Sequence, residues 1–175
     1  MAELSSRDRL QPSLLDRLID HHPQDSRENV EARVLSRPQL RAAVLRDLSW
    51  LFNATRAEPE ATSTRADEVQ LWRQFADARR SVLNFGMPAF SGTTLSSMDT
   101  ETMARAIEQA IIHFEPRIEA KSLKVDITID PLNHHNTLHI GIRGRMWAQP
   151  VPLELVLAAD VDLETGGTFV RDLRA

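Results

Sequence analysis

The chain has 175 residues, of which 42% are apolar and 26% charged, as is typical of a soluble globular domain. Its net charge of -4 gives no overall basic surface, which argues against non-specific nucleic-acid binding. The absence of cysteine excludes disulfides, thiol catalysis and cysteine-ligated metals. No segment approaches the roughly 20 apolar residues that span a bilayer, and the N-terminus lacks an apolar signal-peptide core. We therefore expect a cytoplasmic protein.

The first third of the chain alternates between predicted helices and polar segments. We expect residues 1–11 to form a disordered tail and residues 12–175 to form a single domain. Residues 12–20 predict a short helix whose leucines and isoleucine share one face. A firmer helix begins with Ser36 as N-cap and continues to residue 52 with an apolar stripe. Residues 53–66 have no apolar period and predict a flexible loop.

The middle of the chain holds two further helical patterns around an irregular segment. Residues 67–80 predict a helix whose inward side chains are Val69, Trp72, Phe75 and Ala76. Residues 81–88 are short, apolar and closed by Gly86 and Pro88, which predicts an irregular buried segment leading into a turn. Asp99 then predicts the N-cap of a second strong helix, which runs to residue 114.

From residue 123 the apolar period changes from 3.6 to 2, which indicates strands. The predicted strands cover residues 123–130, 137–143, 153–162 and 168–173. Gly144 predicts a bulge or bend after the second strand. We therefore expect an α+β domain, in which N-terminal helices and a long central helix pack on one face of a small antiparallel sheet.

Histidines and carboxylates give little support to metal or hydrolytic chemistry. The two histidine pairs, His21-His22 and His134-His135, lie in loops, and adjacent side chains diverge, so solvated loops are favoured over metal sites. We expect no metal and no cofactor. Glycoside hydrolysis needs two carboxyls, one of which keeps its proton. The cation of Arg117 instead favours the ionised form of Glu115, so the sequence argues against an enzyme.

The junction Glu115-Pro116-Arg117 is the most informative motif. Pro116 has no N–H, so the preceding helix should stop near Glu115 and leave two opposite charges at a rigid turn. Two interpretations stay open: the charges form a local clamp, or they dock a partner. The sheet edge is equally open, because an edge protected only by Lys124, Asp126 and Thr128 either accepts a partner strand or is blunted by charge.

Six segments resemble, in order, the TssE family of type VI secretion system baseplate subunits, which is grouped with the contractile-phage baseplate wedge proteins labelled lysozyme-like. They are residues 12–18 (PSLLDRL), 44–53 (VLRDLSWLFN), 81–88 (SVLNFGMP), 114–118 (FEPRI), 142–147 (IRGRMW) and 162–166 (DLETG). Each segment alone is weak, whereas together they cover nearly the whole chain and are specific. One departure is Phe85, which stands where tyrosine is frequent in the family.

The resemblance implies a structural component rather than an enzyme. Such subunits sit in the baseplate wedge with TssF, TssG and TssK, at the inner-membrane-docked baseplate in the cytoplasm. They join that wedge to the TssB–TssC sheath and nucleate sheath assembly by strand addition. The family's assembly motif falls on Glu115, Pro116 and Arg117, the expected partner-binding residues. Neither nucleic-acid binding nor direct membrane insertion is implied. The alternatives are a cytosolic peptidoglycan hydrolase (muramidase) and a free peptide-binding adaptor.

Overall fold

The computed structural model describes most of the chain, in seven ranges. They are residues 12–19, 23–24, 35–59, 63–89, 99–129, 137–148 and 152–174. The predicted N-terminal tail, both histidine pairs and the end of the first predicted strand lie outside the described residues.

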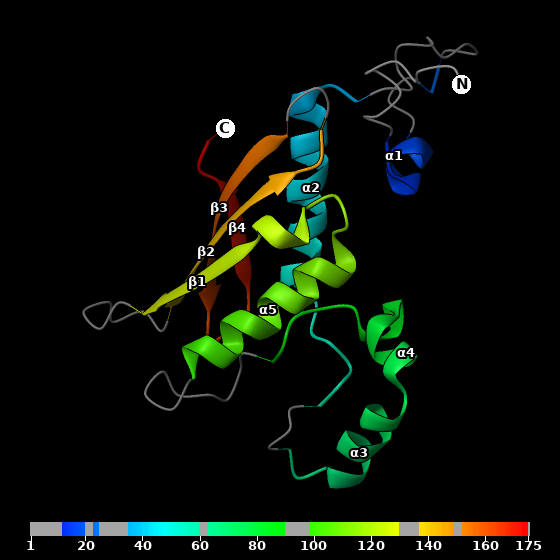
Figure 1. The fold of residues 1–175 in the computed structure, drawn as a ribbon, viewed down its shortest axis with the longest axis vertical. Helices are drawn as coiled ribbons and strands as arrows, with labels where there is room; N and C mark the ends of the chain where they lie inside the picture. The colour runs from blue at the N-terminus through cyan, green and yellow to red at the C-terminus, as the bar shows by residue number, and fades with distance from the viewer. Residues whose placement is uncertain are drawn as a thin grey trace.

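A four-stranded antiparallel sheet forms one layer of the fold, with strand order β1-β2-β3-β4. The strands are β1 (Lys124–Ile129), β2 (Thr137–Met146), β3 (Leu153–Asp162) and β4 (Thr168–Asp172). Helices α2 (Arg37–Phe52) and α5 (Thr100–Phe114) pack on one face of this sheet (Figure 1). The expected α+β architecture, with helices on one face of a small antiparallel sheet, is therefore confirmed.

Local capping explains where the two long helices begin. The Ser36 hydroxyl accepts a hydrogen bond from the Gln39 N–H, and the Gln39 side chain accepts one from the Ser36 N–H, which forms a capping box. The Asp99 carboxylate accepts bonds from the N–H groups of Glu101 and Thr102. Both predicted caps are confirmed, and α5 ends immediately before the Glu115-Pro116 step.

The core lies between this helical layer and the inner face of the sheet. Side chains that are almost fully buried come from both helices and from the two central strands, and they include Val44, Leu48, Ile107, Ile111, Leu138, Ile142, Leu157 and Val161. Each fully buried aliphatic side chain contributes about 1.5–3 kcal/mol relative to exposure, so this interface supplies most of the fold's apolar stabilisation.

The ladder between β2 and β3 passes Gly144 without interruption, since Gly144 pairs with Leu155 in unbroken register. The bulge predicted at Gly144 is therefore wrong. A Cβ on Gly144 would lie 3.3 Å from Ile118 Cγ2, which shows that this residue is small because another segment approaches closely. β2 consequently extends to Met146, beyond its predicted end.

Three short helices carry no buried residue: α1 (Leu14–Leu18), α3 (Ala66–Gln74) and α4 (Ala76–Arg80). The single helix predicted over residues 67–80 is thus two helices, with a break at Phe75. Phe75 is 56% exposed and Ala76 is also exposed, so the prediction that both point inward is wrong. The apolar period was present, but no layer among the described residues covers that side.

The segment after α4 is partly buried and partly exposed. It forms the 3-10 turn η3 (Val82–Asn84), in which Asn84 is buried while the two residues before it are exposed. The prediction of a buried segment over 81–88 is therefore wrong for its first part and confirmed for Gly86, Met87 and Pro88.

The described part of the predicted 53–66 loop is bonded to this segment. Thr55 and Met87 form a parallel bridge, and the Arg56 N–H donates to the Met87 carbonyl at 2.9 Å. Residues 60–62 lie outside the described part of the chain, and the flexibility of this loop stays a prediction.

Candidate docking site

The Glu115-Pro116-Arg117 turn begins as the C-cap of α5. The Glu115 N–H donates to the Ile111 carbonyl at 2.8 Å and closes the last helical turn. The Ile118 N–H then donates back to the Glu115 carbonyl at 3.1 Å, so the chain reverses around Pro116. Because proline cannot continue the helix, the two charged neighbours are fixed by backbone geometry.

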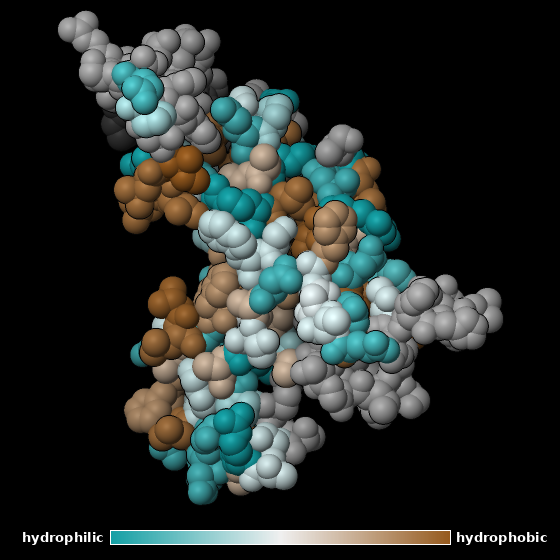
Figure 2. Space-filling view, turned by 180° about the vertical axis from the view of Figure 1, so that it is seen from behind, coloured by the Kyte–Doolittle hydropathy of each residue, from teal (hydrophilic) through white to brown (hydrophobic). Residues whose placement is uncertain are grey.

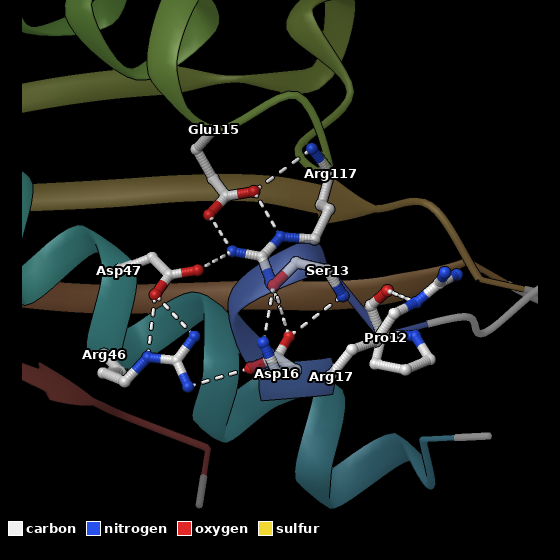
Figure 3. Close-up of polar contacts among 8 residues, drawn as sticks. All are labelled: Pro12, Ser13, Asp16, Arg17, Arg46, Asp47, Glu115 and Arg117. Atoms are coloured by element: carbon white, nitrogen blue, oxygen red, sulfur yellow. Dashed lines mark hydrogen bonds and ion pairs between the residues drawn. The ribbon is translucent and has the colours of Figure 1, made fainter. Parts of the chain in front are cut away.

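Glu115 and Arg117 form a chelated ion pair within this turn (Figure 3). Glu115 Oε1 accepts from Arg117 Nε at 2.6 Å and from the Arg117 backbone N–H at 3.2 Å, while Oε2 accepts from Nη2. Glu115 is only 2% exposed. Its carboxylate is therefore directed at Arg117 and not at solvent, and its role in the free chain is to hold the guanidinium in one orientation.

Two residues of α2 complete the network around this pair. Arg117 Nη2 also donates to Asp47, which is 70 residues away in the sequence. The other oxygen of Asp47 accepts from Arg46 Nε at 2.8 Å, and the Arg46 guanidinium lies 5.3 Å from the centre of the Trp50 ring. Arg46 and Asp47 lie off the apolar stripe of α2, and nothing in the sequence pattern of that helix indicates the turn that they face.

The N-terminal helix α1 joins the same network through Asp16. Arg46 Nη1 lies 2.8 Å from Asp16 Oδ1, and Arg117 Nη1 lies 3.9 Å from Asp16 Oδ2. Asp16 also closes a capping box with Ser13, which fixes its own orientation. The residues Asp16, Arg46, Asp47, Glu115 and Arg117 are called the charged cluster below.

Three residues of the cluster, Arg117, Arg46 and Asp16, have pKa values shifted in favour of their charged forms. Burial lowers the pKa of the Arg117 guanidinium, but the bonds to Glu115 and Asp47 outweigh burial and raise that pKa above its ordinary value. The pKa of Arg46 is raised in the same way, since Asp47 and Asp16 outweigh burial. Burial raises the pKa of Asp16, but hydrogen bonds from Ser13 and Arg46 set it below its ordinary value.

Two guanidinium nitrogens of the cluster are buried without a hydrogen-bond partner among the described residues. Arg46 Nη2 still lies 2.7 Å from Asp47 Oδ1 as an ion pair, whereas Arg117 Nη1 has only Asp16 at 3.9 Å, which is too far for a hydrogen bond. Beside the cluster an open pocket of about 220 Å³ is lined by apolar side chains and by the two carboxylates Asp47 and Glu115, the apolar ones being Leu15, Leu48, Trp50, Leu51, Phe85 and Phe114. This combination suits a partner segment with apolar side chains and one acceptor for arginine.

The turn is bonded to the end of the sheet as well. The Trp147 N–H donates to the Arg117 carbonyl at 2.9 Å, and the Glu119 N–H donates to the Arg145 carbonyl at 2.8 Å. Ile118 and Met146 form the antiparallel bridge between these bonds. The charged cluster therefore occupies a fixed position relative to β2.

The two edges of the sheet are each capped at one point. On β1 the Val125 N–H donates to the Glu108 carboxylate of α5 at 3.1 Å, so it points away from β2. Along an edge strand, backbone N–H groups point alternately toward the neighbouring strand and away from it. The N–H groups of Ile127 and Ile129 therefore also point away from β2. On β4, Asn53 bonds both backbone groups of Thr168. The remainder of the β1 edge, from Ile127 to Ile129, is called the β1 rim below.

Within the described ranges, no three side chains of a metal-binding type are close enough to hold an ion. Among the carboxylates between residues 115 and 126, Glu115 belongs to the cluster, Glu119 pairs with Arg145 at 3.0 Å, and Asp126 lies on the outer face of the sheet. They do not converge on one cleft.

Comparison with known proteins defines the class. A family model described as baseplate wedge protein gp25 matches residues 38–151, well over half of the chain. Together with the α+β fold, this match defines a structural component of a phage-tail-like baseplate. The chain belongs to the gp25 baseplate wedge family and is TssE-like in identity. No curated protein and no solved structure matches it significantly.

Membership implies contacts with other baseplate proteins. The match includes the charged cluster except Asp16, because α1 precedes residue 38, and it includes β1 and β2 but not β3 and β4. None of the helices in the described ranges has the length and apolarity that a bilayer crossing needs.

Proposed function

We propose that the chain is a TssE-type subunit of a type VI secretion system baseplate, in the cytoplasm at the inner membrane. In this role it joins the wedge proteins TssF, TssG and TssK to the TssB–TssC sheath. It begins sheath assembly by offering a strand edge to the first sheath ring. The β1 rim is the observation that carries this proposal, because its outward N–H groups can pair with an added strand in fixed register.

The charged cluster supplies the second half of the proposal. Glu115 is the positioning residue, Pro116 fixes the turn, and Arg117 offers its remaining donor to an acceptor on a wedge or sheath protein. A partly desolvated arginine beside a pocket with aromatic walls is the kind of residue that dominates binding at interfaces. Its attachment to the end of β2 gives the rim and the cluster a constant separation.

The experiment removes one outward backbone N–H of the β1 rim by substituting proline. Proline at position 127 removes a donor that does not bond β2, whereas proline at position 128 removes one from the β1–β2 ladder. We expect Ile127→Pro to leave the fold intact and to stop sheath growth, seen as loss of fluorescent sheaths in cells. Thr128→Pro is the control that damages the fold. Normal sheaths from a folded Ile127→Pro chain would refute strand addition at this rim.

The cluster is tested separately by removing both charges of the buried pair. The double change Glu115→Leu with Arg117→Met replaces the two charged side chains by apolar ones of similar volume. Replacement of a buried ion pair in this way is often neutral for stability. We expect a folded chain that no longer supports sheath growth. If sheaths still extend normally, Glu115, Pro116 and Arg117 are a structural clamp and the docking role is wrong.

A further inference from the structure

Helix α1 lies on the candidate docking site of its own chain. Leu15 lines the apolar pocket beside the turn, and the next residue, Asp16, contacts the charged cluster. The Asp16 side chain is 8% exposed, and its Oδ1 lies 2.8 Å from Arg46 Nη1 (Figure 3). An aliphatic side chain next to a carboxylate is the same chemistry that the site suits in a partner segment.

The hold of α1 on this site is weak. None of its five residues is buried, and the Leu14 and Leu18 side chains are 75% and 74% exposed. Figure 2 shows apolar side chains of α1 at the surface, on one side of a hollow. Because a helix this short is not stable alone in water, α1 depends on its capping box and on the contacts of Leu15 and Asp16.

The contact between α1 and the charged cluster is also incomplete. Asp16 Oδ2 accepts from the Ser13 backbone N–H at 3.1 Å and from the Ser13 hydroxyl at 2.6 Å. The same oxygen stays 3.9 Å from Arg117 Nη1, which leaves that buried donor without a hydrogen bond among the described residues. A buried donor without a partner costs free energy. The cap that shapes α1 therefore prevents Asp16 from bonding both arginines.

A carboxylate from another protein, placed close to the position of Asp16, is free of this conflict. Both of its oxygens can accept from the cluster, one from Arg46 Nη1 and one from Arg117 Nη1, in strong charge-assisted bonds. It replaces the charge of Asp16 and adds none to the site. Against this, α1 is tethered and so has a high effective concentration at the site. A partner displaces α1 when its better contacts outweigh the tether.

The rest of the fold does not depend on α1. The capping box of Ser36 and Gln39 begins α2 without it, and no residue of α1 belongs to the hydrophobic core. The match to the gp25 family begins at residue 38, so it covers the other four residues of the charged cluster but not α1. α1 can therefore leave the docking site without loss of the core.

We propose that α1 is an intramolecular pseudo-ligand, which covers the docking site in the free subunit until a partner segment with a carboxylate beside an aliphatic side chain displaces it. This inference rests on the docking role proposed above for the charged cluster, and adds to it the chemistry of the partner and a regulatory step. If α1 is docked in about nine of ten free molecules, it weakens partner binding by a factor of about ten.

The test measures binding of the full chain to each wedge and sheath subunit of its own baseplate, purified singly. The docking partner is the subunit whose binding is lost with Glu115→Leu and Arg117→Met. We expect Asp16→Asn to tighten binding to that subunit about tenfold. Leu15→Ser should also tighten it, because this change removes the other contact of α1 with the site. Asp77→Asn, the same change at an exposed position of α4, should bind as wild type.

A distance measurement follows α1 directly, since the chain has no native cysteine that would need to be removed. Spin labels on Leu18→Cys and Phe169→Cys, both at exposed positions, place one label on α1 and one on β4. We expect a narrow distribution of distances in the free chain. Addition of the docking partner should make that distribution longer and broader.

Three results would overturn the proposal and leave the docking role intact. The first is equal or weaker binding by either the Asp16→Asn or the Leu15→Ser chain, which would make α1 a fixed wall of the site. The second is an equal gain with Asp77→Asn, which would indicate a general effect of charge. The third is a distance distribution that the bound partner leaves unchanged.

A fourth result separates the two proposals. If the chain with Glu115→Leu and Arg117→Met binds every subunit as the wild type does, the docking role itself is wrong, and the pseudo-ligand role of α1 is wrong with it.

Discussion

At the scale of single residues, Glu115 shows why a motif that looks like a binding site can be a clamp first. A carboxylate at 2% exposure is stable only because Arg117 and the turn supply its hydrogen bonds. Removing one partner of such a pair costs more than removing both, since the remaining charge is left buried.

This asymmetry gives a prediction for Glu115→Ala. We expect it to lower the free energy of unfolding by about 3 kcal/mol, because the Arg117 side chain keeps only Asp47 as a hydrogen-bond partner. The double change Glu115→Leu with Arg117→Met should recover most of that loss. Urea denaturation of wild type and the two variants measures both effects, and a Glu115→Ala chain as stable as wild type would contradict the first.

A second prediction at this scale compares two glycines with positive φ. Gly86 has backbone atoms of residues 54–56 within 2.7 Å of the Cβ position, whereas Gly166, at φ +75°, has nothing within 4 Å. We expect Gly166→Ala to cost about 1 kcal/mol, from backbone conformation alone. Gly86→Ala should cost about 3 kcal/mol or more, since steric overlap is added. Equal midpoints in denaturant would show that residues 54–56 can move aside.

At the scale of elements, α1 is held to the body by charge rather than by burial. Leu14 and Leu18 are 75% and 74% exposed, while Asp16 contacts Arg46. A helix of five residues is not stable alone in water, so its position depends on its capping box and on this contact. The two exposed leucines offer an apolar face to whatever lies beside α1 in the assembly.

The docking of α1 should therefore depend on pH. The pKa of Asp16 lies below 3.8 in the docked state, so its contribution is complete above about pH 4 and is lost as the pH falls through that lowered pKa. Trp50 fluorescence, in a chain with Trp72→Phe and Trp147→Phe, can report the release because Trp50 stacks on Arg46. We expect Asp16→Asn to have α1 released at neutral pH and to lack this transition. An identical acid titration in both chains would contradict the assignment.

Features that depend on nearby residues were predictable from the sequence, and features that depend on distant ones were not. The caps at Ser36 and Asp99 lie within four residues of the groups that they bond, and the strand period is local too. The break at Phe75 was missed because an apolar period does not reveal whether a surface exists to cover it. Gly144 was predicted wrongly because its cause, Ile118, lies elsewhere in the sequence.

The candidate docking site follows the same rule. Its turn, Glu115 to Arg117, was located from the proline and the two charges alone. Asp47 could not be assigned to this turn from the sequence. It is 70 residues away from Arg117, and no sequence pattern links residues that far apart. Asp16 was predicted only as part of a helix, and no sequence pattern indicates that α1 approaches the turn.

At the scale of the whole molecule, a prediction separates an assembly part from a hydrolase. The carboxylates of Glu115 and Asp47 both line the pocket beside the turn, but both accept from the same nitrogen of Arg117, Nη2, so each is already engaged by that cation. We expect purified protein to leave peptidoglycan intact in zymograms, as should Glu115→Gln. Clearing by the wild type that disappears in the Glu115→Gln chain would instead establish a muramidase.

The bonds between residues 117–119 and 145–147 also have a mechanical consequence. These hydrogen bonds are perpendicular to β2. A force along β2 therefore loads all of them at the same time, and they must break together instead of one after another. Tension on the sheet then reaches the α5 terminus through the main chain, without relying on flexible side chains. A subunit bonded in this manner can transmit the recoil of an attached polymer to its anchor before its own strands separate.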